Sequence, residues 1–96
     1  MTEPEHVGHW WVLVEETDGG YRGRRLFPLQ PAEDREDALR LAEEAARTYE
    51  PRHPAMPQSR SVFRTMNDSW VVLVEGATST FHFTVTVAKG EPASPA

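Results

Sequence analysis

Two stretches of the chain, sixty residues apart, carry almost the same run of strand-favouring hydrophobic residues. Residues 10–15 read WWVLVE and residues 70–75 read WVVLVE, so five of the six positions match. A strand with one side in water alternates apolar and polar residues, and neither run does. Both faces of both strands are therefore expected to need cover.

The rest of the pattern places these runs in a ββαβββ order. The expected strands are 9–15, 21–27, 60–66, 70–75 and 80–88, and the expected helix is 33–49. Asp18-Gly19-Gly20 supplies turn residues for a first hairpin, and Pro28 and Pro31 are expected to end the second strand. The prediction is an α+β fold, a twisted antiparallel five-stranded sheet with one α-helix packed on one face. Residues 8–89 would form this single domain, with 1–7 and 90–96 as disordered tails.

The expected helix has a defined start and a narrow apolar stripe. Asp34 is the expected N-cap, with Asp37 in the capping-box position three residues later. The stripe consists of Ala38, Leu39, Ala42, Ala45, Ala46 and Tyr49. Because most of these side chains are alanine, the helix can lie close against a sheet.

Hairpins that turn at the centre of their loops assign the side chains to two faces. This register sets Val14 opposite Tyr21, Val74 opposite Phe81, and Phe63 opposite Val72. The helix-facing side then receives Trp10, Val12, Val14, Tyr21, Phe63, Trp70, Val72, Val74, Phe81, Phe83, Val85 and Val87. The other side receives an apolar centre of Trp11, Leu13, Val62, Val71 and Leu73, bordered by Arg22, Arg24, Arg64, His82, Thr84 and Thr86.

One helix covers only one of these faces, so the second apolar centre has no expected cover within the chain. A patch of several hundred Å² is at or above what an inert monomer exposes. Homodimerisation through stacked sheets is the simplest cover. A partly closed, barrel-like sheet and a groove for an apolar or acidic partner are the alternatives. The residues expected at this interface or binding site are Trp11, Leu13, Arg22, Arg24, Arg64, Val71, Leu73 and His82.

Composition limits the chemistry. The 96 residues suffice for one domain, and the absence of cysteine excludes disulfides and thiolate sites. The first residues are acidic, with no basic region followed by an apolar one, so no signal peptide is expected and the predicted location is cytoplasmic. The net charge of -5 argues against a dedicated nucleic-acid binder, although Arg22, Arg24 and Arg25 could grip phosphate.

Candidate catalytic and metal-binding groups are few. His6 and His9 are separated by two residues, but no helix aligns them, and no Asp or Glu is placed to orient His82 as a base. No nucleophile-elbow, phosphate-loop or paired-carboxylate pattern occurs, so no enzyme, metal or cofactor is predicted. The predicted function is a small non-enzymatic protein–protein interaction module that homodimerises. The alternatives are a binding protein for a small anionic or aromatic ligand, in a helix–sheet or dimer-seam pocket, and a single-stranded nucleic-acid binder.

Overall fold

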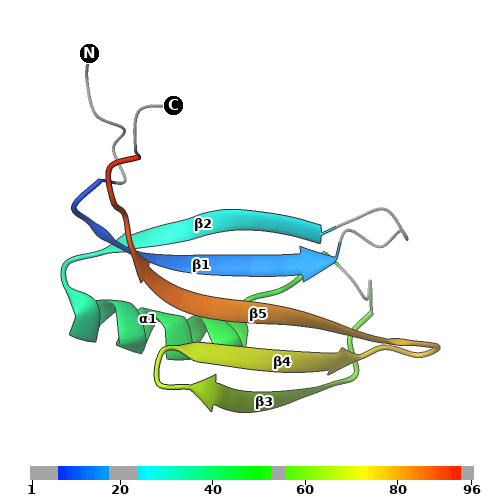
Figure 1. The fold of residues 1–96 in the computed structure, drawn as a ribbon. Helices are drawn as coiled ribbons and strands as arrows, with labels where there is room; N and C mark the ends of the chain where they lie inside the picture. Colours follow the sequence, from blue (N-terminus) through cyan, green and yellow to red (C-terminus); the bar gives the residue numbers. More distant parts are fainter. Residues whose placement is uncertain (1–6, 18–23, 53–55, 94–96) are drawn as a thin grey trace.

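The computed structural model describes residues 7–17, 24–52 and 56–93, and it confirms the α+β fold with ββαβββ order. The elements are β1 (Trp10–Thr17), β2 (Arg24–Ala32), α1 (Arg35–Thr48), β3 (Ser59–Met66), β4 (Ser69–Glu75) and β5 (Thr80–Lys89). The five strands form one antiparallel sheet in the order β2-β1-β5-β4-β3. The helix lies across one face of this twisted sheet (Figure 1).

The last strand of the chain occupies the centre of the sheet, between the two near-duplicate strands. Both β1 and β4 pair with β5, and Val14 of β1 and Trp70 of β4 both oppose Val85. Each of the duplicated strands is therefore an inner strand, with its backbone hydrogen-bonded on both edges, while the helix covers only one of its two apolar faces. Their own hairpin partners, β2 and β3, form the two edges of the sheet.

The helix begins and packs as its sequence predicts. The Asp34 carboxylate accepts a hydrogen bond from the Asp37 N–H at 2.8 Å, and the Asp37 carboxylate accepts one from the Glu33 N–H at 3.0 Å. The first bond satisfies an N–H of the first turn that the helix itself leaves unbonded, and the second ties the residue before the N-cap to that turn, which fixes where the helix starts. The stripe is confirmed, because Ala38, Ala42, Ala45 and Ala46 are its buried residues.

The buried core lies between this stripe and one face of the sheet. Its sheet residues are Val12, Val14, Trp70, Val72, Val74, Phe83, Val85 and Val87, all of which the sequence places on the helix-facing side. At the other end of the helix, Arg60 of β3 donates hydrogen bonds to the carbonyl oxygens of Ala46 at 3.0 Å and Tyr49 at 2.6 Å. These bonds satisfy terminal carbonyls of the helix and tie its end to the sheet.

The register of β2 corrects the sequence-based prediction. Val14 opposes Phe27, whereas the prediction set Tyr21 there, and the strand continues through Pro28 and Pro31 to Ala32. Proline is tolerated because β2 is an edge strand, where one side of the backbone needs no partner. The register also shifts between Val12 and Leu13. The predicted turn at 18–20 and the predicted place of Tyr21 lie outside the described residues.

A second correction concerns β3, where a bulge moves the register by one residue. The turn falls at Asn67-Asp68 as predicted, but the pairing shifts between Arg64 and Met66, so Val62 opposes Val72. Phe63 was predicted there, and it opposes Val71 on the uncovered face instead. Because neighbouring strand residues point to opposite faces, one extra residue exchanges the predicted faces of Val62, Phe63 and Arg64.

The β4–β5 hairpin has the predicted register, with Val72 opposite Phe83 and Val74 opposite Phe81. The sheet as a whole stays open: β2 and β3 are its edges, and within the described ranges they do not pair with each other. The barrel-like closure considered from the sequence is therefore wrong.

Candidate functional site

The face of the sheet opposite the helix carries most of the residues predicted as an interface. Within residues 7–17, 24–52 and 56–93, no other helix or strand lies over it (Figure 1). We call this side the uncovered face. Its apolar side chains are Trp11, Leu13, Leu26, Pro28, Pro31, Phe63, Met66, Val71, Leu73 and Ala88. Leu26 is 63% exposed, Phe63 51% and Leu73 37%, so water contacts large hydrophobic groups here.

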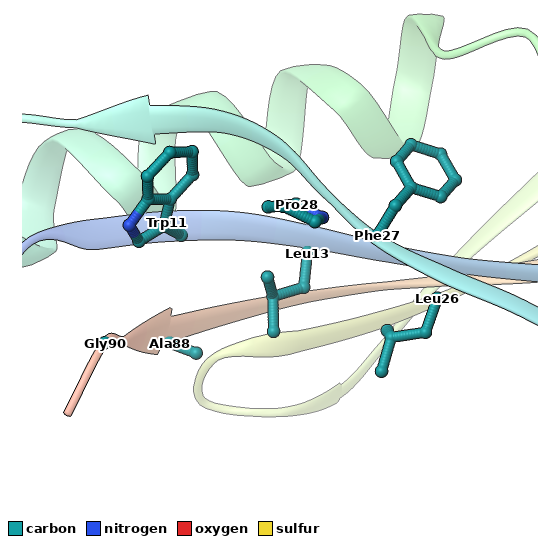
Figure 2. A pocket seen from close by; sticks show the side chains of 7 residues that line it. All are labelled: Trp11, Leu13, Leu26, Phe27, Pro28, Ala88 and Gly90. Carbon is teal, nitrogen blue, oxygen red and sulfur yellow. The ribbon is translucent and has the colours of Figure 1, made fainter. Parts of the chain in front are cut away.

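An open apolar hollow of about 320 Å³ lies at one end of this face. Its lining comes from β1, β2 and the end of β5: Trp11, Leu13, Leu26, Phe27, Pro28, Ala88 and Gly90 (Figure 2). Ala88 contributes only a methyl group and Gly90 has no side chain, so they leave open the space beside the Trp11 ring. Backbone hydrogen bonds from Gly8 N–H to Gly90 O and from Gly90 N–H to His9 O, each 2.9 Å, fix that end of the chain next to the hollow.

Trp11 contributes a polar group, its indole N–H, to the apolar hollow. Its ring is partly buried, and the indole Nε1 is fully shielded from solvent without a hydrogen-bond partner in the described structure. A buried donor left without an acceptor costs roughly 1–3 kcal/mol.

Polar side chains of β5 divide the apolar groups of the uncovered face into two halves. Leu13 opposes Thr86 across the β1–β5 ladder, while Val71 opposes Thr84 and Leu73 opposes His82 across the β5–β4 ladder. One half is the hollow over β1 and β2. The other half consists of Phe63, Val71 and Leu73 on β3 and β4. The face is therefore apolar, polar and apolar again across the five strands.

Charges on the uncovered face are sparse. Arg24, whose side chain is 73% exposed, lies 3.9 Å from the carboxylate of Glu15, which is 35% exposed. The sequence places Arg24 on this face and offers Glu15 as its partner, and the geometry agrees. His82 is exposed and lines a small hollow together with Glu15, Arg24 and Thr84. Arg22 lies outside the described residues.

Arg64 is not part of this face, which corrects its prediction as a rim residue. It opposes Trp70, and its guanidinium carbon lies 4.9 Å from the centre of that indole ring on the helix side of the sheet. It donates hydrogen bonds to the carbonyl oxygens of Met66, at 3.4 Å, and Asn67. The bulge in β3 is the cause, because it exchanges the two faces at this strand.

A buried carboxylate, which no sequence pattern pointed to, lies on the helix side. Glu16 is 3% exposed, accepts a hydrogen bond from the Tyr49 hydroxyl at 2.9 Å, and has Arg25 at 3.7 Å. Burial, and then the hydrogen bond to this carboxylate, raise the pKa of Tyr49 from 10.0 to about 12. Tyr49 also packs edge-on against Phe83, with ring centres 5.2 Å apart. The cluster joins β1, β2 and the end of the helix, so its evident role is structural.

Sequence reasoning missed part of the hollow for a definable reason. Pro28 was taken to end a strand and so received no place on the uncovered face. Leu26 lay within the predicted strand 21–27, in phase with Arg22 and Arg24, but was not assigned to that face. Phe63 was assigned to the wrong side by the undetected bulge. The hydrophobic residues around the two prolines could have indicated that β2 continues past them, because an edge strand accommodates proline.

The described ranges hold no other obvious chemical centre. No group of three His, Asp or Glu side chains in them has a metal-binding arrangement, and no helix there is long and apolar enough to cross a membrane. Comparison with known proteins adds no relative, since no protein-family model, no curated protein and no solved structure matches the chain.

Proposed function

We propose that this chain is a non-enzymatic protein–protein interaction module that homodimerises through the uncovered face. The observation that carries the proposal is the exposure of Leu26, Phe63 and Leu73 on a side of the sheet that no described element covers. These groups lie with Trp11, Leu13 and Val71 in one plane, whereas solitary exposed hydrophobics would be scattered. Burying them against a second copy removes apolar surface from water, which favours association.

The size of the face is consistent with a dimer. Five strands about 4.8 Å apart, with about eight residues of about 3.3 Å each, span about 600 Å² of sheet. Protruding side chains add accessible area to that plane, and a standard interface buries about 800 Å² per partner. The pairing of Glu15 with Arg24 also limits the desolvation of isolated charge, which would oppose the stacking of two identical surfaces.

Light scattering at tens of micromolar protein tests this proposal. The wild-type chain is expected to have twice the mass of one chain, and Leu13→Glu is expected to be a folded monomer because it places a charge in the apolar face. Met56→Glu is the matched control, since Met56 is 78% exposed and lies outside the sheet, and it should stay dimeric. A monomeric wild-type chain would contradict the proposal.

The hollow supports a second candidate function, the binding of a small aromatic ligand. Its volume falls at the lower end of small-molecule sites, and its lining is apolar with an indole at one end. Anilinonaphthalene sulfonate, an aromatic anion, is a suitable probe. Its fluorescence should rise with the wild-type chain and rise less with Ala88→Leu, which fills the hollow. An equal response from both proteins would count against this site.

A single-stranded nucleic-acid site has less support. Arg64 lies on the helix side over Trp70, and Arg24 is next to a carboxylate, so these two do not form a free basic border around Trp11.

A further inference from the structure

The two apolar halves of the uncovered face differ in relief. The β1–β2 half is hollowed beside Trp11, Leu13 and Leu26. On the β3–β4 half, Phe63 is half-exposed on the edge strand, and the neighbouring Leu73 is also exposed. One half thus offers a concave apolar surface and the other a projecting aromatic ring. A cavity of about 320 Å³ is large enough for an aromatic side chain.

The order of the strands relates these halves by position. The sheet runs β2-β1-β5-β4-β3, so β3 lies two strands from β5 on one side, as β2 does on the other. Phe63 opposes Val71, Val71 opposes Thr84, Thr84 opposes Glu15, and Glu15 opposes Leu26. Phe63 and Leu26 therefore occupy the same row across the sheet, at equal distances in strands from its centre.

A two-fold axis between two stacked sheets, directed along β5, exchanges left and right but keeps the position along the strands. It sets β3 of one copy over β2 of the other, and β4 over β1. Phe63 of each copy then lies over the row of Leu26, at the mouth of the hollow. Such an interface is isologous, because the same two complementary patches are used twice. No complementary patch then remains exposed to bind a third copy.

We propose that two copies stack face to face about a two-fold axis along β5, with Phe63 of each copy inserted into the hollow of the other. This arrangement rests on the proposed homodimer and specifies its geometry. The occupant of the hollow is a second copy because the chain itself carries both the cavity and an exposed ring in the matching row. Thr84 and Thr86 lie at the axis, where each faces its equivalent across the interface.

Cross-linking tests the axis, and the chain is suited to it because it has no cysteine. Packed sheets lie about 10 Å apart, so a bis-maleimide of about that span joins two cysteines that face each other. Thr84→Cys, at the axis, should give covalent dimers in high yield. Ser61→Cys is the matched control, since it is exposed on the same face but lies on the edge strand β3, far from its equivalent in the second copy.

A second variant tests the insertion. Phe63→Ala should weaken the dimer at least tenfold, measured by light scattering over a dilution series, and should leave the far-ultraviolet circular dichroism unchanged. Met56→Ala, a comparable truncation outside the sheet, should leave the dissociation constant within twofold.

The outcomes separate the two proposals. A wild-type chain that is monomeric overturns both of them. A wild-type dimer in which Ser61→Cys cross-links and Thr84→Cys does not, or in which Phe63→Ala has no effect, overturns this arrangement and leaves the homodimer standing. Cross-linking at Thr84 together with the loss of affinity in Phe63→Ala supports the arrangement.

Discussion

β1 and β4 have nearly the same sequence and flank the same central strand, yet their matching residues differ in burial. Trp70 of β4 is 3% exposed, whereas its counterpart Trp10 of β1 is only partly buried. Leu13 borders the hollow, and its counterpart Leu73 is exposed. The two strands are offset along β5, because Val14 and Trp70 both oppose Val85. Position in the sheet, more than the identity of the residue, thus decides what each side chain contributes.

The largest expected difference between the two strands concerns their first tryptophans. Trp70→Ala should lower the free energy of unfolding by about 3–5 kcal/mol, because a buried ring is removed and a cavity remains. Trp10→Ala should cost about 1–2 kcal/mol, since less apolar area is lost and each Å² is worth about 25 cal/mol. Guanidinium denaturation of both variants measures the two values. Equal losses would show that the strands are interchangeable.

The single mismatch between the strands gives the next prediction. Trp11→Val makes the two runs identical and removes one wall of the hollow, so the proposed dimer should dissociate at least tenfold more readily, as a dilution series would show. The stability of the monomer should change by less than about 1 kcal/mol, because the lost contacts are offset by removal of an unsatisfied N–H. Unchanged dimerisation would place the interface elsewhere.

The residue after each run also differs, since Glu16 continues β1 whereas Gly76 follows the end of β4. Tyr49→Phe removes the hydrogen bond to Glu16 and should cost about 1 kcal/mol near neutral pH. The pKa of Tyr49 is raised in the folded state, so this contribution is complete below pH 10 and is lost as the pH rises towards 12.

The stability difference between the wild type and Tyr49→Phe should therefore narrow between pH 10 and pH 12, measured by denaturant titration at each pH. The other tyrosine of the chain, Tyr21, is present in both proteins, so its own titration cancels from the difference. A gap that widens with pH would mean that the Tyr49 hydroxyl is not the group responsible.

The smallest effect is expected at the glutamates that end the two runs. Glu15 has Arg24 at 3.9 Å, and the pair is largely solvated, so Glu15→Gln should lower stability by less than about 0.5 kcal/mol and lose that effect in 1 M salt. Glu75→Gln is the matched substitution in β4, and it should change stability even less. A loss of more than about 1 kcal/mol in Glu15→Gln would indicate a stronger role for this pair than its exposure suggests.

How much of this molecule was predictable depends on the length and regularity of each connection. The β4–β5 register was correct because its short loop leaves little freedom, and the helix start was correct because Asp34 and Asp37 have a specific capping spacing. Proline at positions 28 and 31 was wrongly taken as a strand end, since its tolerance at an edge depends on the sheet order. The bulge near Thr65 has no distinct sequence pattern, and it moved Phe63, Val62 and Arg64 to unexpected faces.

Within the candidate site, the odd-numbered residues of β1 and β4 were predictable from alternation alone. Arg24 was assigned to the correct face despite the wrong register, because the error in β2 was an even number of residues there. The hollow was not predictable, since it arises where Trp11 meets Ala88 and Gly90 from the far end of the chain.

The prolines of β2 also bear on the risk of aggregation. A sheet with two free edges can recruit further strands at both ends, and long edges of this kind are a known route to fibres. Pro28 and Pro31 offer no N–H to an incoming strand, so β2 is a poor template, while β3 has no proline. Growth at the β3 edge would join two copies and leave β2 at both outer ends. The two prolines thus oppose polymerisation by strand addition at the β2 edge of the sheet.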